Sequence, residues 1–201
     1  MLRRDLLYLS IPALLRAQGT RAPAAPLDVL RGNVERISRS INAKWGIYIK
    51  CIETGEEIAL NADEQMDTMS VIKIPLMVEA FRQMEAGKFK LTDREVLRGE
   101  DRLPGTGIIR SLDDGAQLTI KDLLTMMIIV SANTATDMIF AKVGGIEPVN
   151  ELMKSYGLRQ TRATAPARVW FEALRAAPSP ADFHREGKHP FGLSSARVLP
   201  Q

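Results

Sequence analysis

The chain has 201 residues, of which 45% are hydrophobic and 25% charged, with 14 Gly and 11 Pro. This composition is typical of an ordinary globular protein and excludes collagen-like, low-complexity and wholly disordered classes. The formal charge of +3 arises in residues 1–44, which hold eight Lys/Arg against three Asp/Glu, so residues 45–201 are slightly acidic. We therefore expect no nucleic-acid partner, because a nucleic-acid binder carries its positive charge on the folded part.

Residues 1–19 have the order of an export signal: Arg3 and Arg4 precede an apolar run, and small residues follow it. The paired arginines also resemble a twin-arginine signal, which exports proteins already folded. The alternative is an amphipathic N-terminal helix on a cytosolic protein, because Arg16 interrupts the apolar run. We expect a periplasmic or secreted protein, with no stable membrane insertion once the signal is removed.

Predicted elements begin after a Pro- and Ala-rich linker over residues 20–26. Apolar residues from Leu27 to Ile41 recur at spacings of three and four, which predicts an amphipathic helix. The runs Trp45–Ile52 and Ile58–Leu60 flank a turn and predict a β-hairpin. They are the only two strands that the sequence predicts, and an isolated hairpin is marginally stable in water.

The segment Val71–Met84 is apolar on nearly all sides, which predicts a helix buried in the centre of the protein. Thr119 and Asp122 have the spacing of a capping box and predict a helix that runs through Ile129. Two further helices are predicted over residues 134–143 and 148–156.

After residue 162 the helical and strand periodicities disappear, and ten of the nineteen residues 163–181 are Ala or Pro. We expect residues 163–201 to be irregular and loop-like, with no closing strand or helix.

Ser70 and Lys73 are the first pair with chemical potential. At i and i+3 on the start of a helix, the two side chains face the same way. The helix dipole favours a negative oxygen there, and a partly desolvated lysine has a lowered pKa and can take the serine proton. The alternative is a capping serine followed by a surface lysine, and this spacing alone favours that alternative.

Ser131 and Asn133 lie at a break between two predicted helices and can point into one cleft. Ser131 could relay a proton to a leaving group, and the side-chain amide of Asn133 could hold an amide substrate. The alternative is a helix N-cap, because Ser and Asn are both preferred there.

Residues 47–158 resemble the class A β-lactamases and the related serine penicillin-recognising enzymes. Ser70 and Ser131 are 61 residues apart, a spacing similar to the family's. The segments that carry the resemblance are Thr54-Gly55, Met69-Ser70-Val71-Ile72-Lys73, Pro104-Gly105-Thr106-Gly107-Ile108, Leu118-Thr119-Ile120-Lys121-Asp122-Leu123-Leu124, Ser131-Ala132-Asn133-Thr134-Ala135 and Gly144-Gly145.

The resemblance implies an α/β fold of the β-lactamase/transpeptidase type, with an antiparallel sheet, flanking helices and a mostly helical part. It assigns residues 27–162 to a partial β-lactamase-like domain. It implies that Ser70 is the acyl-forming nucleophile, that Lys73 accepts its proton, and that Ser131 and Asn133 form the second motif. It implies a small-molecule β-lactam or cell-wall peptide as partner, with no metal or organic cofactor, and we expect a monomer.

The sequence departs from the family at several points. Ala132 stands where the family has Asp, which is mainly a structural hydrogen-bonding residue. Pro166 and Ala167 occupy the expected position of the deacylating glutamate, and Glu172 is the nearest carboxylate that could replace it. For Glu172, a solvated loop carboxylate is the favoured alternative to a base that activates water.

No Lys-Thr-Gly or Lys-Ser-Gly occurs in the sequence, so the family's third motif is absent from it. We therefore expect a C-terminally truncated relative with an incomplete sheet. Three functions stay open: a serine β-lactamase-like hydrolase, a catalytically inactive relative, or a penicillin-binding D-Ala-D-Ala carboxypeptidase or transpeptidase.

Overall fold

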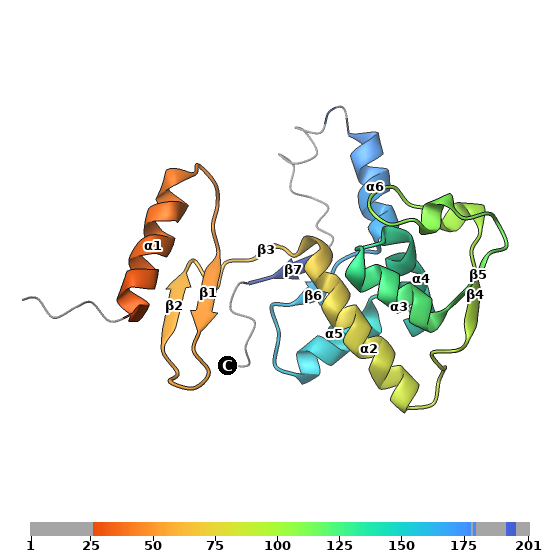
Figure 1. Cartoon of the computed structure of the whole chain (residues 1–201), viewed down its shortest axis with the longest axis horizontal. Helices are drawn as coiled ribbons and strands as arrows, with labels where there is room; N and C mark the ends of the chain where they lie inside the picture. Colours follow the sequence, from red (N-terminus) through yellow and green to blue (C-terminus); the bar gives the residue numbers. More distant parts are fainter. Residues whose placement is uncertain (1–25, 178, 180–191, 196–201) are drawn as a thin grey trace, which may run out of the picture. The chain divides into compact units, whose positions relative to one another are not determined.

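The computed structural model describes residues 26–177, 179 and 192–195. The predicted export signal of residues 1–19 and the linker residues 20–25 lie outside the described residues. The chain divides into two units between Lys44 and Trp45, and Figure 1 labels the elements of both.

The first unit contains helix α1 (Pro26–Ser40), which confirms the helix predicted from the apolar spacing. The helix starts at Pro26, which the sequence had placed in the linker. Proline is tolerated in a first helical turn because the N–H that it lacks would have no partner there. Asp28 in the first turn and Arg39 in the last complement the helix dipole.

The second unit opens with the predicted hairpin. Strand β1 (Ile47–Lys50) pairs antiparallel with β2 (Glu57–Leu60), and Ile49 lies opposite Ile58. Strand β1 is shorter than the run Trp45–Ile52 that predicted it, because Trp45 and Ile52 lie outside the paired register, whereas β2 begins one residue before the run Ile58–Leu60. The side chain of Ile58 is buried.

Two further small antiparallel sheets were not predicted. Strands β3 (Met66–Asp67), β7 (Gly192–Ser194) and β6 (Arg162–Ala163) form one sheet with β7 in the middle, and β4 (Arg94–Val96) pairs with β5 (Gln117–Thr119). The expectation of only two strands and no late strand was therefore wrong. Strands of two or three residues are too short for a period-2 pattern to be read from sequence.

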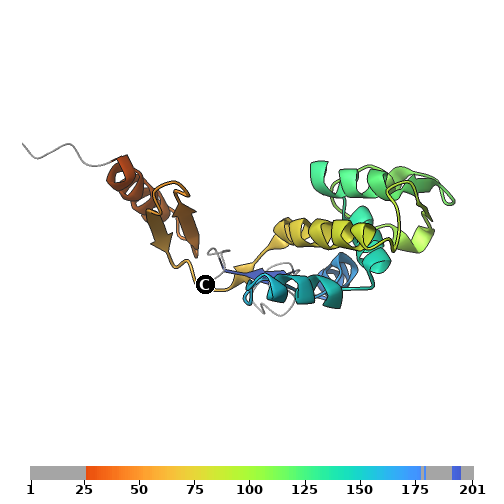
Figure 2. The ribbon, with the colours of Figure 1, turned by 90° about the horizontal axis from the view of Figure 1, so that it is seen from below.

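The helical part is built from α2 (Lys73–Glu85), α3 (Ile120–Ile129), α4 (Asn133–Val143), α5 (Glu147–Ser155) and α6 (Ala167–Ala176). The short 3-10 turn η1 (Met69–Ile72) directly precedes α2, and the turns η2 (Gly99–Asp101) and η3 (Ile109–Ser111) lie between α2 and α3. Helix α2 packs against α3, α4 and α5, and Figure 2 shows it between α3 and α5. The first four helices confirm the predicted ones within a few residues.

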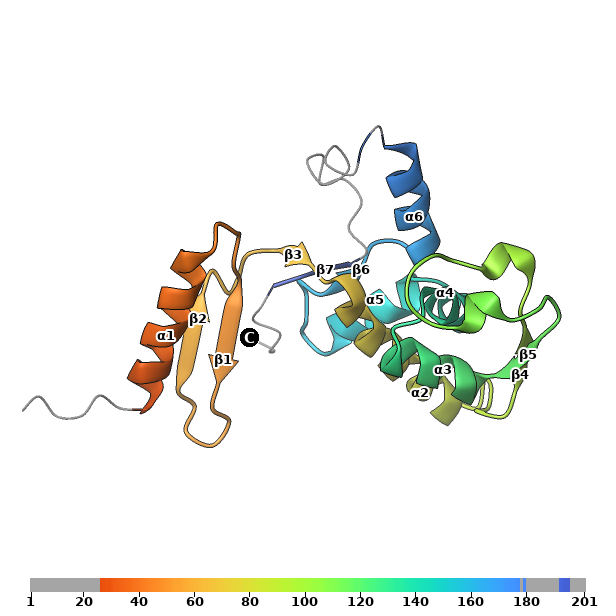
Figure 3. The ribbon, with the colours of Figure 1, turned by 45° about the horizontal axis from the view of Figure 1, so that its top comes forward.

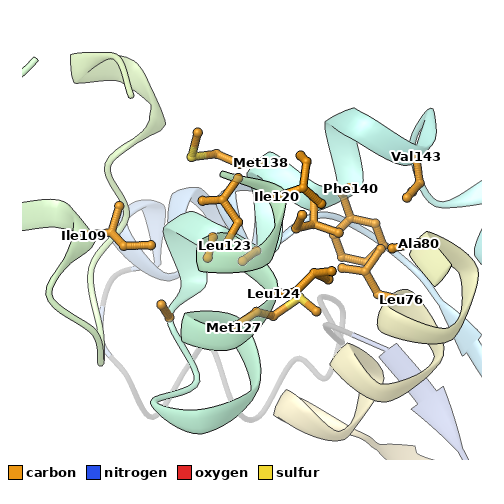
Figure 4. Packing of buried hydrophobic residues seen from close by; sticks show 14 of the residues in the cluster. Leu76, Ala80, Ile109, Ile120, Leu123, Leu124, Met127, Met138, Phe140 and Val143 are labelled. Carbon is orange, nitrogen blue, oxygen red and sulfur yellow. The ribbon is translucent and has the colours of Figure 1, made fainter. Parts of the chain in front are cut away.

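The core of the helical part joins α2, α3 and α4 (Figure 4). Figure 4 shows Leu76, Leu123 and Phe140 in this cluster. Leu76, Leu123 and Ile139 have no exposed surface, and Phe140 is almost as deeply buried. The predicted capping box of α3 is present, since Thr119 accepts from the backbone N–H of Asp122 and the Asp122 carboxylate accepts from Thr119.

Helix α2 is buried on one face rather than on all sides, so that prediction was wrong. Val71, in η1, Ile74 and Phe81 lie on the outer face and are 61%, 54% and 44% exposed. The polar Glu79 and Gln83 are instead buried. Arg82 donates two 2.7 Å hydrogen bonds to the Glu79 carboxylate, and Gln83 bonds both Glu79 and the Val143 carbonyl. Periodicity could not foresee this burial because it depends on partners that are distant in the chain.

Helix α6 contradicts the expectation that residues 163–201 are irregular. Alanine has the highest helix propensity, and the segment Ala167–Ala176 contains no Gly or Pro. Pro166 directly before the helix has an extended backbone and no side-chain cap. The Asp137 side chain, on α4, caps the helix instead, because it accepts from the backbone N–H groups of Ala167 and Arg168. Figure 3 shows that α6 begins beside α4.

Candidate active site

Ser70 is the second residue of η1, the turn that lies between β3 and α2. Its side chain is exposed, and the residue before it, Met69, has a left-handed backbone with φ of 44°. A non-glycine residue in that region is strained, and such strain gathers at functional sites. Thr68 is the N-cap of η1 and Ile72 that of α2, so the capping alternative for Ser70 was wrong.

Lys73 is the first residue of α2, and its side chain is only 2% exposed. Its Nζ donates to the Ser131 carbonyl at 2.7 Å, to Ser131 Oγ at 2.8 Å and to Asn133 Oδ1 at 3.0 Å. Burial lowers the pKa of Lys73 to about 8, against the charge of Asp137, which raises it. The surface-lysine alternative was therefore wrong, because this ammonium group lies between two motifs and not in solvent.

Ser131 connects the two motifs. Its Oγ donates to Ser70 Oγ at 2.8 Å while accepting from Lys73, so a continuous chain of hydrogen bonds runs from Lys73 through Ser131 to Ser70. The backbone of Ser131 is left-handed, with φ of 55°. This turn between α3 and α4 aims both the hydroxyl and the carbonyl of Ser131 at Lys73.

Asn133 is the first residue of α4, whose N-cap is Ala132 and has no side-chain cap. Neither Ser131 nor Asn133 is therefore the N-cap. The amide oxygen of Asn133 accepts from Lys73, and its amide nitrogen donates to the Pro104 carbonyl at 3.0 Å. An amide nitrogen carries two hydrogens, so one donor remains for a ligand.

A glycine-rich loop lies against this turn. Thr106 Oγ1 donates to the Ser131 carbonyl at 3.1 Å. Gly107 has φ of +98°, and a Cβ there would lie 2.6 Å from the Cβ of Ala132, a buried residue. The contact requires glycine, so the loop and the turn are fitted to each other. The sequence resemblance included this loop, but no role was assigned to Pro104 or Thr106.

Asp137, on α4, is the functional candidate that sequence reasoning missed. Its carboxylate accepts from the backbone N–H groups of Ala167 at 2.7 Å and Arg168 at 2.9 Å. Burial raises the pKa of Asp137, although these hydrogen bonds and the charges of Arg168 and Lys73 oppose the rise. The one sequence signal was its place four residues after Asn133, on the same face of the helix.

Helix α6 forms one wall of a small cavity beside Ser70. The cavity has a volume of about 180 Å³. Its described lining residues are Met69, Ser70, Asn133, Ala167, Trp170 and Phe171. The rings of Trp170 and Phe171 meet edge to face, with centroids 4.9 Å apart. Glu172 follows them on α6, but its side chain is exposed and is not in this lining.

The structure thus brings Ser70, Lys73, Ser131 and Asn133 together and leaves Glu172 apart from them. Within the described residues, no group of three or more His, Cys, Asp or Glu side chains could hold a metal ion. In that same part of the chain, every helix is too short or too polar to cross a membrane. The chemistry available at this site is that of two hydroxyls and a buried amine.

The site thus links two serine hydroxyls to a buried lysine on an α/β framework. The model of the β-lactamase enzyme family matches residues 30–189, and the chain belongs to this family. The chain is 28% identical to β-lactamase L2 of Stenotrophomonas maltophilia over 152 residues, 74% of this chain and 50% of that protein. It spans about half the length of the curated relatives that it matches.

Two solved structures are also similar. A β-lactamase from Sphaerobacter thermophilus is 29% identical, with a TM-score of 0.68 over 83% of this chain and 57% of that one. An acyl-enzyme complex of the L158E mutant of PBP-A with penicillin G is 25% identical, with a TM-score of 0.68 over 88% and 61% of the two chains. These similarities confirm the predicted fold type.

Proposed function

We propose that the chain is a serine acyl-transfer enzyme of class A β-lactamase type that opens the amide bond of a β-lactam. The observation that carries the proposal is the chain of hydrogen bonds from Lys73 through Ser131 to Ser70. A nucleophilic serine needs a base within hydrogen-bond reach, and this chain supplies a buried amine through one intervening hydroxyl.

In the acylation step, Ser70 Oγ bonds to the carbonyl carbon and the C–N bond of the amide breaks. The Ser70 proton passes to Ser131 Oγ, whose own proton passes to neutral Lys73; hydroxyl hydrogens rotate, so the observed bonds reverse direction once Lys73 is neutral. Ser131 can then donate a proton to the leaving nitrogen, and Lys73 returns one to Ser131. Asn133 would hold the substrate amide with its remaining donor.

In the deacylation step, water must release the acyl group, and it needs a base. The described lining of the cavity holds Ala167 and no carboxylate, and Glu172 would have to move to serve. This observation favours a second candidate function: a penicillin-binding carboxypeptidase or transpeptidase type of protein that releases bound penicillin slowly. The similarity to PBP-A, solved as an acyl-enzyme with penicillin G, supports the same candidate.

The test is intact-mass spectrometry of the full chain after incubation with benzylpenicillin. We expect an adduct of one opened penicillin, absent in Ser70→Ala and retained in Ser111→Ala, an exposed serine of η3. An adduct that persists in Ser70→Ala would refute the assignment of the nucleophile. The rate at which the wild-type adduct decays separates hydrolase from slow penicillin binder, and the absence of any adduct supports an inactive relative.

Export belongs to the same proposal, because a β-lactam target or substrate lies outside the cytoplasm. Arg3, Arg4 and the apolar run after them carry it. N-terminal sequencing of protein from the periplasm should begin between Gln18 and Leu27. Recovery of Met1 from a cytoplasmic pool would contradict export.

A further inference from the structure

A second hollow lies among β4, η2, α4 and the start of α6, and its volume is about 690 Å³. Its described lining includes no residue of the hydrogen-bonded chain Lys73–Ser131–Ser70, so it is separate from the candidate active site. Ligand sites in proteins usually enclose about 300–1,000 Å³. The hollow therefore has room for a small organic molecule.

Three carboxylates line this hollow, and each of them already accepts hydrogen bonds from the chain itself. Glu95 accepts from Lys142 Nζ at 2.7 Å, and Asp101 accepts from the backbone N–H of Arg98 at 2.8 Å. Asp137 accepts from two backbone N–H groups at the start of α6. The fold therefore uses these carboxylates to hold its own elements together.

Two arginines of the hollow are less engaged. Within the described residues, neither Arg94 nor Arg98 forms a salt bridge. The Arg94 guanidinium donates to the Gln117 carbonyl at a long 3.4 Å. A guanidinium has five N–H donors and no acceptor. The hydrogen-bonding capacity left in the hollow is therefore mainly that of cationic donors, which suits an anion.

These two arginines lie in one row with Val96. The backbone is extended from β4 to Arg98, which has φ of −113° and ψ of 160°. Alternate side chains of an extended segment share a face, and Leu97, between Val96 and Arg98, is fully buried on the other face. Val169 on α6 lines the same hollow. Val96 and Val169 are 45% and 43% exposed, so apolar surface lies beside the cationic donors.

We propose that this hollow binds a small organic oxyanion. Arg94 and Arg98 hold its carboxylate or phosphate group, and Val96 and Val169 contact its apolar part. The planar guanidinium matches the oxygens of either group with two parallel hydrogen bonds. The site does not depend on acylation of Ser70, because none of its residues takes part in that chemistry.

The experiment is an NMR titration of the full chain with cyclohexyl phosphate and with cyclohexanecarboxylate. The wild type should bind both, and the ratio of their affinities tells whether phosphate or carboxylate is the preferred group. Inorganic phosphate should bind about 10-fold more weakly, because it has no apolar surface to bury. Cyclohexanol, which keeps the ring but has no charge, should also bind about 10-fold more weakly.

The variants Arg94→Gln and Arg98→Gln remove one cationic group each from an exposed side chain. Each should weaken binding of the two organic anions by about 10-fold. Arg110→Gln is the matched control, because Arg110 is exposed in η3 and is not in the described lining. It makes the same change of charge and should bind as the wild type does. Equal urea midpoints for all three variants would verify that they are folded.

The position of the bound probe is the second readout. Chemical-shift changes should gather at Val96 and Val169; changes confined to Trp170 and Phe171 would place the probe beside Ser70 and overturn the proposal. Failure of both organic anions to bind, or affinities unchanged in both Arg94→Gln and Arg98→Gln, would overturn it as well. Inorganic phosphate that binds as tightly as cyclohexyl phosphate would refute the apolar contact.

Discussion

The Asp137 carboxylate accepts a 2.7 Å hydrogen bond from the backbone N–H of Ala167. This bond joins the helix that carries Asn133 to the helix that carries the aromatic wall. The N-terminal N–H groups of a helix have no partner within it, and a carboxylate satisfies them and the positive end of the dipole together. One side chain on α4 therefore fixes where α6 begins.

Asp137→Ala should destabilise α6 and lower the pKa of Lys73. The change removes the acceptor of two N–H groups, and we expect the free energy of unfolding to fall by about 1–3 kcal/mol. Asp137→Asn keeps one acceptor oxygen but no charge, so it should cost less stability and shift the pKa in the same direction. Urea denaturation and the pH profile of acylation check the two effects separately. A profile unchanged in both variants would mean that the charge of Asp137 does not reach Lys73.

Acylation should rise with pH around a midpoint near 8, the pKa to which burial lowers Lys73. The neutral amine accepts the proton, so its fraction grows as pH increases, and the rate levels off once Lys73 is fully deprotonated. Stopped-flow measurement of acylation from pH 6 to 10 by benzylpenicillin gives the curve. Lys73→Arg, which keeps a cation with no accessible neutral form, should lose about 10²–10⁴-fold in rate. A flat profile in the wild type would remove Lys73 from the role of base.

Gln83→Met should destabilise the contact between α2 and α4. Gln83 is buried and donates to both Glu79 and the Val143 carbonyl, and methionine keeps the shape but no donor. We expect a loss of about 1–3 kcal/mol in unfolding free energy at pH 7. The exposed Gln117→Met is the control and should be neutral.

The pH dependence of that loss has a definite sign. Burial acts to raise the pKa of Glu79, but hydrogen bonds from Arg82 and Gln83 and the charge of Arg82 outweigh it, so the pKa is lowered. The stability that ionised Glu79 contributes is present above the pKa of the unfolded chain, about 4.3, and is lost as pH falls through the folded-state value. The effect of Gln83→Met should therefore be larger at pH 7 than at pH 3. Equal losses of unfolding free energy at pH 7 and at pH 3 would show that the hydrogen bond from Gln83 does not stabilise the ionised form of Glu79.

Polar substitutions on the outer face of α2 should reduce self-association without weakening the fold. Val71 and Ile74 are more than half exposed, and exposed apolar patches promote association. Ile74→Gln should leave the urea midpoint unchanged and lower light scattering at high concentration. Leu76→Ala, on the buried face, is the contrast and should cost about 2–5 kcal/mol.

The sequence was sufficient for the parts of the molecule that local pattern controls. The apolar spacing from Leu27 to Ile41 predicted α1, and the capping box at Thr119 predicted α3. The two serine motifs, at Ser70 and Ser131, were expected to meet, and a hydrogen bond joins them. It was insufficient where a distant residue supplies the stabilising contact. Helix α6 depends on Asp137, thirty residues earlier in the chain.

The site divides in the same way. Ser70, Lys73, Ser131 and Asn133 could be predicted from spacing and resemblance, and hydrogen bonds connect them: Lys73 bonds Ser131 and Asn133, and Ser131 bonds Ser70. The chain of hydrogen bonds from Lys73 through Ser131 to Ser70 could not be predicted from the sequence, because it depends on the left-handed backbone at Ser131.

The fit between Gly107 and Ala132 has an evolutionary consequence. Because a Cβ at position 107 would collide with the side chain at position 132, the residues acceptable at either position depend on the other. Ala132→Asp, which introduces the residue usual in the family, would place a carboxylate at this buried position beside the loop. Any side chain added at position 107 would meet the residue at position 132, so the two positions are expected to be epistatic.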